Sequence, residues 1–238
     1  MSTGGHQPPQ VTSSPAPAHP PAAPPAEQQD VSNQHGPPSN AATQQQQQQQ
    51  EQHAPAAPAQ QQTPPTKVAV PRELQNCDSA FVSQLVMEMI SRLILHNDRI
   101  PLTSATITRF HSRAPPAIKP EDYLRRVVKY ASVEPSVIIT ILVYIDRICD
   151  IHQHFTISSL TVHRFIIAAV TVGSKALSDI YCTNTYYARV GGLPLTELNL
   201  IEMDFCKMIG WRLSCSMEVL QQYYVNLVRT NPGFDLMH

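Results

Sequence analysis

The run Pro135-Ser136-Val137-Ile138-Ile139-Thr140-Ile141-Leu142-Val143-Tyr144-Ile145 decides the fold of this chain. It is apolar on nearly every side, and it continues through Asp146-Arg147-Ile148-Cys149 without a turn signal. Its many β-branched residues would also suit a strand, and periodicity alone does not separate the two, but the length of the segment favours a helix. A helix that is apolar all round is buried on every side. The run therefore predicts a central helix with other helices packed around it.

Helical signals also occur on both sides of this run. Before it, apolar residues recur at steps of three and four between Val82 and Ile94, and Asp78 or Ser79 is the expected N-cap. Pro120 suits the first turn of a helix, and Gly191-Gly192 is a stop signal. No hairpin dipeptide with flanking alternation occurs, so we expect an all-α fold. The further predicted helices cover about residues 78–96, 120–131, 158–177, 184–190, 195–209 and 216–229.

A change of composition divides the chain. Up to about residue 71 it consists mainly of Pro, Gln, Ala and Ser, with an unbroken glutamine run over residues 44–50. Such a segment buries too little apolar surface to offset the entropy cost of ordering it. We therefore expect a disordered tail over residues 1–71 and a folded domain over residues 72–238.

Several classes of function find no support in the sequence. The 17 Lys and Arg balance the 18 Asp and Glu, which gives no basic footprint for nucleic acid. No apolar run approaches the roughly 20 residues of a membrane span, and the start of the chain lacks the features of a secretory signal. There is no G-x-S-x-G, no glycine-rich phosphate loop and no H-E-x-x-H. We expect a non-enzymatic protein of the nucleus or cytoplasm, without a membrane, nucleic-acid or small-molecule partner.

The cysteines and histidines do not form a ligand set. His152 and His154 are two residues apart, so they would face apart on a helix, and no Cys or acid completes a site. We expect His163 to be a packed, hydrogen-bonded side chain, and we expect no metal and no cofactor. The cysteines contain no C-x-x-C pair, and their odd number indicates reduced thiols; they are Cys77, Cys149, Cys182, Cys206 and Cys215.

Six short phrases along the predicted helices identify a family. They are Tyr123-Leu124-Arg125-Arg126; Tyr144-Ile145-Asp146-Arg147; Ser159-Leu160-Thr161-Val162-His163-Arg164; Gly173-Ser174-Lys175; Thr183-Asn184 with Tyr187-Ala188-Arg189-Val190-Gly191-Gly192; and Glu197-Leu198-Asn199 with Glu202. Each phrase alone is a weak signal, but six in this order at helix-compatible spacing are specific. Over about residues 80–215 the chain resembles the cyclin box. More narrowly, it resembles the PHO-type cyclins of fungi, which serve the kinase of phosphate and glycogen metabolism.

The resemblance implies a single five-helix cyclin box over about residues 119–210, with flanking helices over about residues 78–96 and 216–229. It implies a regulatory subunit that binds and activates a cyclin-dependent serine/threonine protein kinase. Only nine residues follow Arg229, so we expect no second box, in keeping with PHO-type cyclins. The alternative from another class is a helical adaptor or transcription-associated domain, in which polyglutamine and proline tracts often occur.

Lys175 and Glu202 are the candidate kinase-binding residues. In the cyclins that this chain resembles, the equivalent lysine and glutamate both face the kinase and bond backbone groups around its regulatory helix. An ammonium suits exposed carbonyl groups, and a carboxylate accepts hydrogen bonds from free N–H groups. A different interpretation is an internal Lys–Glu pair, or two solvated side chains. The residues alone do not decide between these arrangements.

Arg126 and Asp146 are the candidate pair that fixes the fold. Asp146 lies in an otherwise apolar helix, and a polar side chain inside a bundle needs a partner. Arg126, in the preceding predicted helix, could reach it if the two helices packed antiparallel. The family likeness implies such a bond, and the alternative is a solvated Asp146 at a helix end.

Asp179 lies four residues beyond Lys175, at the edge of the surface predicted to meet the kinase. It could be an ordinary loop acid. The sharper hypothesis comes from kinase chemistry, in which a phosphate commonly orders the activation loop by pairing with arginines. A carboxylate from the cyclin could pair with one such arginine and allow activity without loop phosphorylation.

Overall fold

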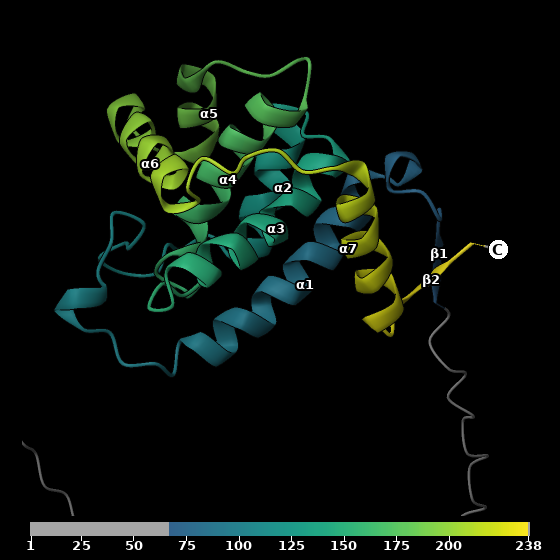
Figure 1. The fold of residues 1–238 in the computed structure, drawn as a ribbon, viewed down its shortest axis with the longest axis horizontal. Coiled ribbons are helices and arrows are strands. Elements are labelled where there is room, and N and C mark those ends of the chain that lie inside the picture. Colours follow the sequence, from purple (N-terminus) through teal and green to yellow (C-terminus); the bar gives the residue numbers. More distant parts are fainter. Residues whose placement is uncertain (1–66, 238) are drawn as a thin grey trace, which may run out of the picture. The chain divides into compact units, whose positions relative to one another are not determined.

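The computed structural model describes residues 67–237 (Figure 1), so residues 1–66 of the tail predicted over residues 1–71 lie outside the described range. The helical class is confirmed for this part of the chain, which also holds two short strands. The elements are β1 (Val68–Val70), the 3-10 turn η1 (Leu74–Asn76), α1 (Ser79–Asn97), the 3-10 turn η2 (Ser104–Thr106), α2 (Pro120–Ala131), α3 (Pro135–Ile151), α4 (Val162–Leu177), α5 (Asn184–Gly191), α6 (Leu195–Met208), α7 (Met217–Thr230) and β2 (Phe234–Leu236).

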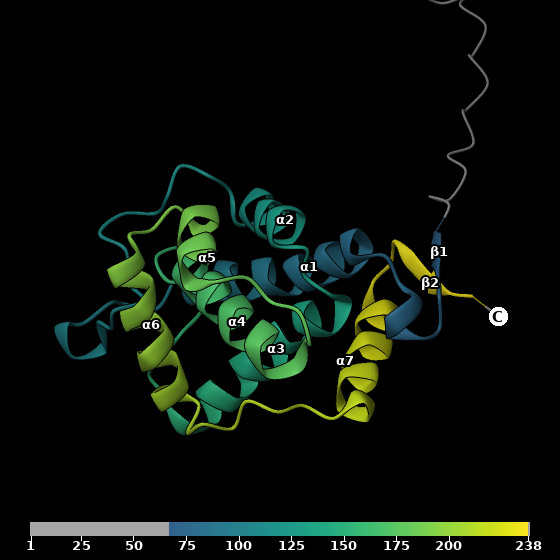
Figure 2. The same ribbon diagram turned by 90° about the horizontal axis from the view of Figure 1, so that it is seen from above.

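The central helix is α3, as the apolar run predicts. Every residue from Val137 to Ile145 is buried, and α3 packs against α1, α4 and α7. The hydroxyl of Tyr144 donates a hydrogen bond to the Leu213 carbonyl oxygen at 2.7 Å, so its one polar atom is satisfied. Helix α4 is buried even more fully, with every residue from Phe165 to Ser174 buried. Figure 2 shows α3 and α4 in the middle of the bundle, with α6 on one side and α7 on the other.

Most helix starts follow from side-chain caps or from a proline in the first turn. The Asp78 carboxylate accepts from the Ala80 N–H at 2.7 Å, and the hydroxyls of Thr183 and Ser216 cap α5 and α7 in the same way. Both α2 and α3 have proline in their first turn. The predicted starts of these five helices are therefore confirmed to within a residue. No helix among residues 67–237 has both the length and the apolarity that a membrane crossing requires.

The start of α4 was predicted wrongly. Ser158 does not cap it; the backbone N–H of Ser158 donates to the Thr161 hydroxyl at 2.9 Å, and Thr161 N–H returns a bond to the Ser158 carbonyl at 3.1 Å. These bonds close a turn, and α4 begins only at Val162.

The boundary between tail and domain also needs correction. Strand β1 pairs in parallel with β2, with Val68 opposite Phe234 and Val70 opposite Leu236. Val70 is completely buried, and the Tyr224 hydroxyl donates to the Pro71 carbonyl oxygen at 2.6 Å. Residues 68–71 therefore belong to the folded domain rather than to the predicted tail.

Candidate functional site

The structure brings Lys175 and Glu202 together. Lys175 lies in the last turn of α4 and Glu202 in the middle of α6, and the Lys175 ammonium donates to Glu202 Oε1 at 2.5 Å. The two side chains are 32% and 18% exposed, so the pair is neither buried nor freely solvated. The internal pair is thus formed, and both partners remain accessible at the surface.

A third side chain completes the arrangement. Asn184, the first residue of α5, donates one hydrogen of its amide to Glu202 Oε2 at 2.6 Å and the other to Asn199 Oδ1 at 2.8 Å. Asn184 and Asn199 were part of the sequence phrases, but no role was predicted for them. Partners 15 and 18 residues apart lie on different helices, and spacing along the chain does not indicate such contacts.

Other ion pairs fix α6 in place. Arg164, on α4, pairs with Glu197 at the start of α6, and its guanidinium also donates to the Arg109 carbonyl oxygen at 2.8 Å. Arg109 itself pairs with Asp204 of α6 at 2.8 Å. The helix that carries Glu202 is therefore tied both to α4 and to the segment before α2.

The predicted pair of Arg126 and Asp146 does not form. Arg126 Nε donates to the Val190 carbonyl oxygen at 2.9 Å, and its Nη2 reaches the same atom. The neighbouring Tyr123 hydroxyl donates to the Gly191 carbonyl oxygen at 3.1 Å. Arg126 therefore caps the end of α5, where helix carbonyl groups lack an internal partner. Its helix, α2, packs on α1, α4 and α5.

Asp146 instead faces the last helix. Its carboxylate accepts from the Tyr223 hydroxyl of α7 at 2.5 Å. Partial burial is the main cause that raises the pKa of Tyr223, to about 12, and the hydrogen bond to Asp146 is the second. The phenol therefore stays a donor at neutral pH. Asp146 still ties two helices together, but through a different partner from the one predicted.

Exposed apolar side chains lie close in the sequence to Lys175 and Glu202. Met203 follows Glu202 on α6 and is exposed; Leu200 is exposed too, but side chains two residues apart on a helix point to different sides, so it faces away from Glu202. Ile180 and Tyr181 follow α4, and Ile180 is 89% exposed, which is unusual for so large an apolar residue. Asp179 lies beside them; it is exposed and makes no hydrogen bond or ion pair within residues 67–237. We call Lys175, Glu202, Met203, Asp179, Ile180 and Tyr181 the α4–α6 surface.

The titratable groups near this surface do not suggest catalysis. Burial raises the pKa of the Cys206 thiol, and the neighbouring Glu202 carboxylate adds to the shift, so Cys206 stays neutral. His163 is packed and hydrogen-bonded as predicted, with its Nε2 2.8 Å from the Ile118 carbonyl oxygen. Among the described residues, no three His, Cys, Asp or Glu side chains gather as a metal site would require.

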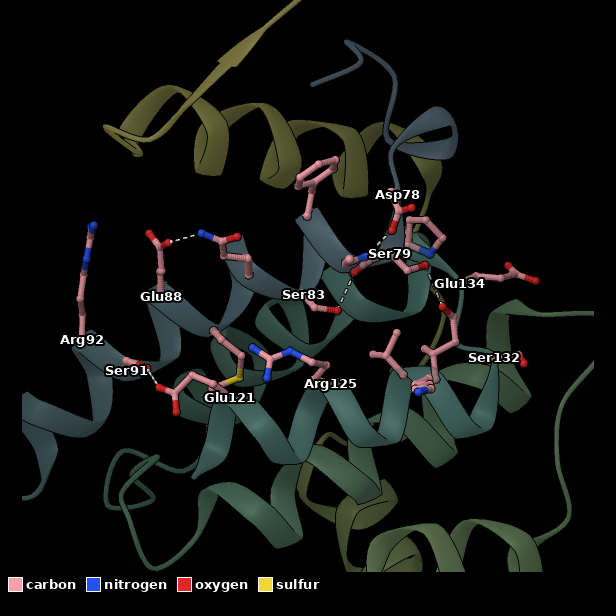
Figure 3. Close-up of a pocket in the computed structure, with 18 residues that line it drawn as sticks. Asp78, Ser79, Ser83, Glu88, Ser91, Arg92, Glu121, Arg125, Ser132 and Glu134 are labelled. Atoms are coloured by element: carbon pink, nitrogen blue, oxygen red, sulfur yellow. Dashed lines mark hydrogen bonds between the residues drawn. The ribbon is translucent and has the colours of Figure 1, made fainter. Parts of the chain in front are cut away.

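A large groove lies elsewhere, between α1 and α2 (Figure 3), with a volume of about 1230 Å³. Its carboxylates are already engaged: Glu88 accepts from Gln84 at 3.2 Å, and Glu121 accepts from Ser91 at 2.7 Å. Acids and bases both line it, and no ligand of one charge is favoured. None of the residues of the α4–α6 surface contributes to this groove.

Comparison with known proteins shows which family the sequence matches. A family model described as Cyclin matches residues 31–213. The chain is 41% identical over 170 residues to the Nuc-1 negative regulatory protein preg of Neurospora crassa, covering 70% of this chain and 35% of that protein. It is 36% identical to the PHO85 cyclin PHO80 of Saccharomyces cerevisiae (67% and 58% covered) and 37% identical to the PHO85 cyclin-like protein psl1 of Schizosaccharomyces pombe (61% and 67%). The matched region thus spans about one third to two thirds of the length of these relatives.

Proposed function

This chain belongs to the cyclin family, and from that premise we propose that it is a regulatory subunit that binds and activates a cyclin-dependent serine/threonine protein kinase. Cyclins are regulatory subunits rather than enzymes. The absence of a catalytic motif from the sequence agrees with this role. The names of two relatives describe them as PHO85 cyclins or cyclin-like, and we extend a kinase partner of the PHO85 type to this chain.

The observation that carries the proposal is the α4–α6 surface. It combines a partly exposed ion pair with exposed apolar side chains on α6 and in the segment after α4, and hydrogen bonds fix the polar atoms of the pair. Polar bonds across an interface contribute most to affinity where the charged groups are partly desolvated and apolar contacts surround them. A kinase helix packed here would meet Lys175 as a donor and Glu202 as an acceptor.

The finer features of the function are part of the same proposal. We place the protein in phosphate regulation, which its resemblance to the PHO-type cyclins implies, and in the nucleus, the cytoplasm or both. Asp179 is proposed to pair with an arginine of the kinase activation loop in place of a phosphate. Its exposure, its lack of an internal partner among the described residues and its position beside Ile180 support this role.

Purification with a PHO85-type kinase tests the proposal. The wild-type chain should co-purify with the kinase and raise its activity on a peptide substrate. Lys175→Ala and Glu202→Ala should each lower the affinity about 10- to 100-fold, because a hydrogen bond to a charged group contributes about 1.5–3 kcal/mol. The helical circular dichroism should not change. Recovery of polymerase subunits without a kinase would instead support the adaptor alternative.

A charge exchange makes the test sharper. The double variant Lys175→Glu/Glu202→Lys can still form an internal ion pair and loses only the hydrogen bond from Asn184, so its free energy of unfolding should fall by at most about 3 kcal/mol. It presents the opposite charges to the kinase, however, and it should bind no better than either single alanine variant. Wild-type affinity in the exchanged variant would show that the pair has only an internal role.

A further inference from the structure

The amide of Asn184 has both of its donor hydrogens engaged on the α4–α6 surface. One hydrogen bonds Asn199 Oδ1 and the other bonds Glu202 Oε2, at 2.8 and 2.6 Å. An amide held at both hydrogens has a single orientation. Glu202 in turn has each carboxylate oxygen engaged by a different helix, Oε1 by Lys175 of α4 and Oε2 by Asn184 of α5. Its carboxylate is thus held before any partner arrives.

Asn184 itself sits on a fixed support. The other end of α5 is capped by Arg126 and by the Tyr123 hydroxyl, which donate to the carbonyl oxygens of Val190 and Gly191. At its start, the hydroxyl of Thr183, and not Asn184, accepts the capping hydrogen bond from the backbone. The amide of Asn184 is therefore not needed for the helix, since alanine at this position would favour helix formation slightly. Its contacts are with α6 alone.

From this geometry we propose that Asn184 is a positioning residue for kinase recognition: it holds the Glu202 carboxylate in the orientation that the kinase binds. The inference rests on the proposed function and adds a residue and a mechanism to it. A long, flexible glutamate loses rotamer freedom when it binds, and a side chain that is already ordered loses less. Removing the amide should therefore weaken binding without removing any direct contact with the kinase.

The first experiment uses the isolated chain and needs no kinase. The side-chain amide signals of Asn184 are followed by two-dimensional ¹⁵N NMR. Glu202→Gln should shift both Asn184 amide protons clearly, because a charged acceptor is replaced by a neutral one. Glu218→Gln makes the same change at an exposed position on α7 and should leave them unmoved. Amide protons of Asn184 that do not respond to Glu202→Gln would overturn the inference.

The second experiment is a double-mutant cycle on kinase affinity. Asn184→Ala should weaken binding about three- to tenfold, in the range of one hydrogen bond. In a Glu202→Ala background the same substitution should have no further effect, because there is no carboxylate left to hold. A structural role for Asn184 would give equal losses in the two backgrounds, and that result would overturn the inference.

Two further variants complete this design. Asn184→Asp keeps the shape but places a second carboxylate against Glu202, so it should weaken binding at least as much as alanine does. Asn226→Ala makes the same truncation on the exposed side of α7 and should leave the affinity unchanged. Wild-type affinity of Asn184→Asp would overturn this inference alone. A wild-type chain that binds no cyclin-dependent kinase would overturn the proposed function as well.

Discussion

Single side chains on the α4–α6 surface serve two purposes at once. Lys175 and Glu202 neutralise each other and still expose a third and a fifth of their side chains. A carboxylate has room for about four hydrogen bonds, and Glu202 uses two. Pairing inside the cyclin therefore leaves acceptor capacity for a kinase N–H, and binding need not break the ion pair.

Asp179 allows a test of activation that is separate from binding. Asp179→Asn keeps the shape of the side chain and removes its charge. We expect this variant to bind the kinase through Lys175 and Glu202 but to activate it several-fold less, because an amide cannot neutralise an activation-loop arginine. The measurement is the rate on a peptide substrate at saturating cyclin. Asp150→Asn, an exposed acid on α3, is the matched control, and activity equal to wild type in both variants would exclude the role.

Arg126 should matter for stability. Arg126→Ala leaves the carbonyl groups at the end of α5 without their charged donor. We expect the free energy of unfolding to fall by about 1.5–3 kcal/mol, measured by urea denaturation. Its neighbour Arg125 provides the control, because it is exposed and its ion pair within residues 67–237 is with the exposed Asp122, so Arg125→Ala should cost at most about 0.5 kcal/mol. Equal losses in the two variants would contradict the capping role.

The two residues of the predicted fold-fixing pair show where sequence reasoning ends at this scale. That Arg126 and Asp146 would each need a partner followed from their chemistry. The partner of Arg126 is a backbone carbonyl oxygen, which every residue possesses, so no sequence pattern marks it. The partner of Asp146 is Tyr223, 77 residues away on a helix whose packing was unknown.

At the scale of elements, what could be predicted depended on whether the signal is local. Caps, N-terminal prolines and apolar periodicity act within a few residues, and the helices they mark were found within about two residues of their ends. The exception, α4, starts late because Thr161 and Ser158 bond each other across a turn. Strands β1 and β2 have three residues each, too few to show alternation, and they pair across more than 160 positions.

Strand β1 should contribute measurably to stability. A chain that starts at Arg72 lacks Val70, and burial of a valine contributes about 1.5–3 kcal/mol. It also lacks the carbonyl group that accepts from Tyr224. We expect its free energy of unfolding to be lower by at least that amount, as measured by urea denaturation. A chain that starts at Lys67 keeps β1 and should match the full-length protein, which is the remaining prediction for the tail.

The whole domain depends on one apolar core that runs through α3 and α4, and a histidine lies at its edge. His163 is 7% exposed, and its Nδ1 has no hydrogen-bond partner among the described residues. Burial lowers the pKa of His163 below its ordinary value of 6.5, against smaller opposing effects of the Ile118 carbonyl and Glu121. Protonation therefore favours the unfolded chain, in which the imidazole is solvated.

Stability should accordingly depend on pH. The contribution of His163 to the free energy of unfolding should be constant above about pH 6.5. Below that pH the free energy of unfolding should decrease, because the unfolded chain then binds a proton more readily than the folded chain does. His163→Gln retains a donor for the Ile118 carbonyl and should reduce this dependence, measured as the free energy of unfolding from pH 7.5 to 5. The exposed His96→Gln on α1 is the control and should leave it unchanged. Identical pH profiles for the wild type and both variants would contradict the role of His163. Burial also lowers the pKa of His111, so His111 would account for any pH dependence that remains in His163→Gln.

The parallel pairing of β1 with β2 has a mechanical consequence. The chain enters the folded domain at the start of β1 and leaves it at the end of β2, and the two strands run in the same direction. Tension applied between Lys67 and Met237 would pull the two strands along each other in opposite directions. The hydrogen bonds between the strands would then bear the force together rather than one after another. These include the bonds from Val68 N–H to the Gly233 carbonyl and from Met237 N–H to the Val70 carbonyl, both 2.8 Å. The β1–β2 pair would thus resist shear between its two strands and protect the helices from being stretched.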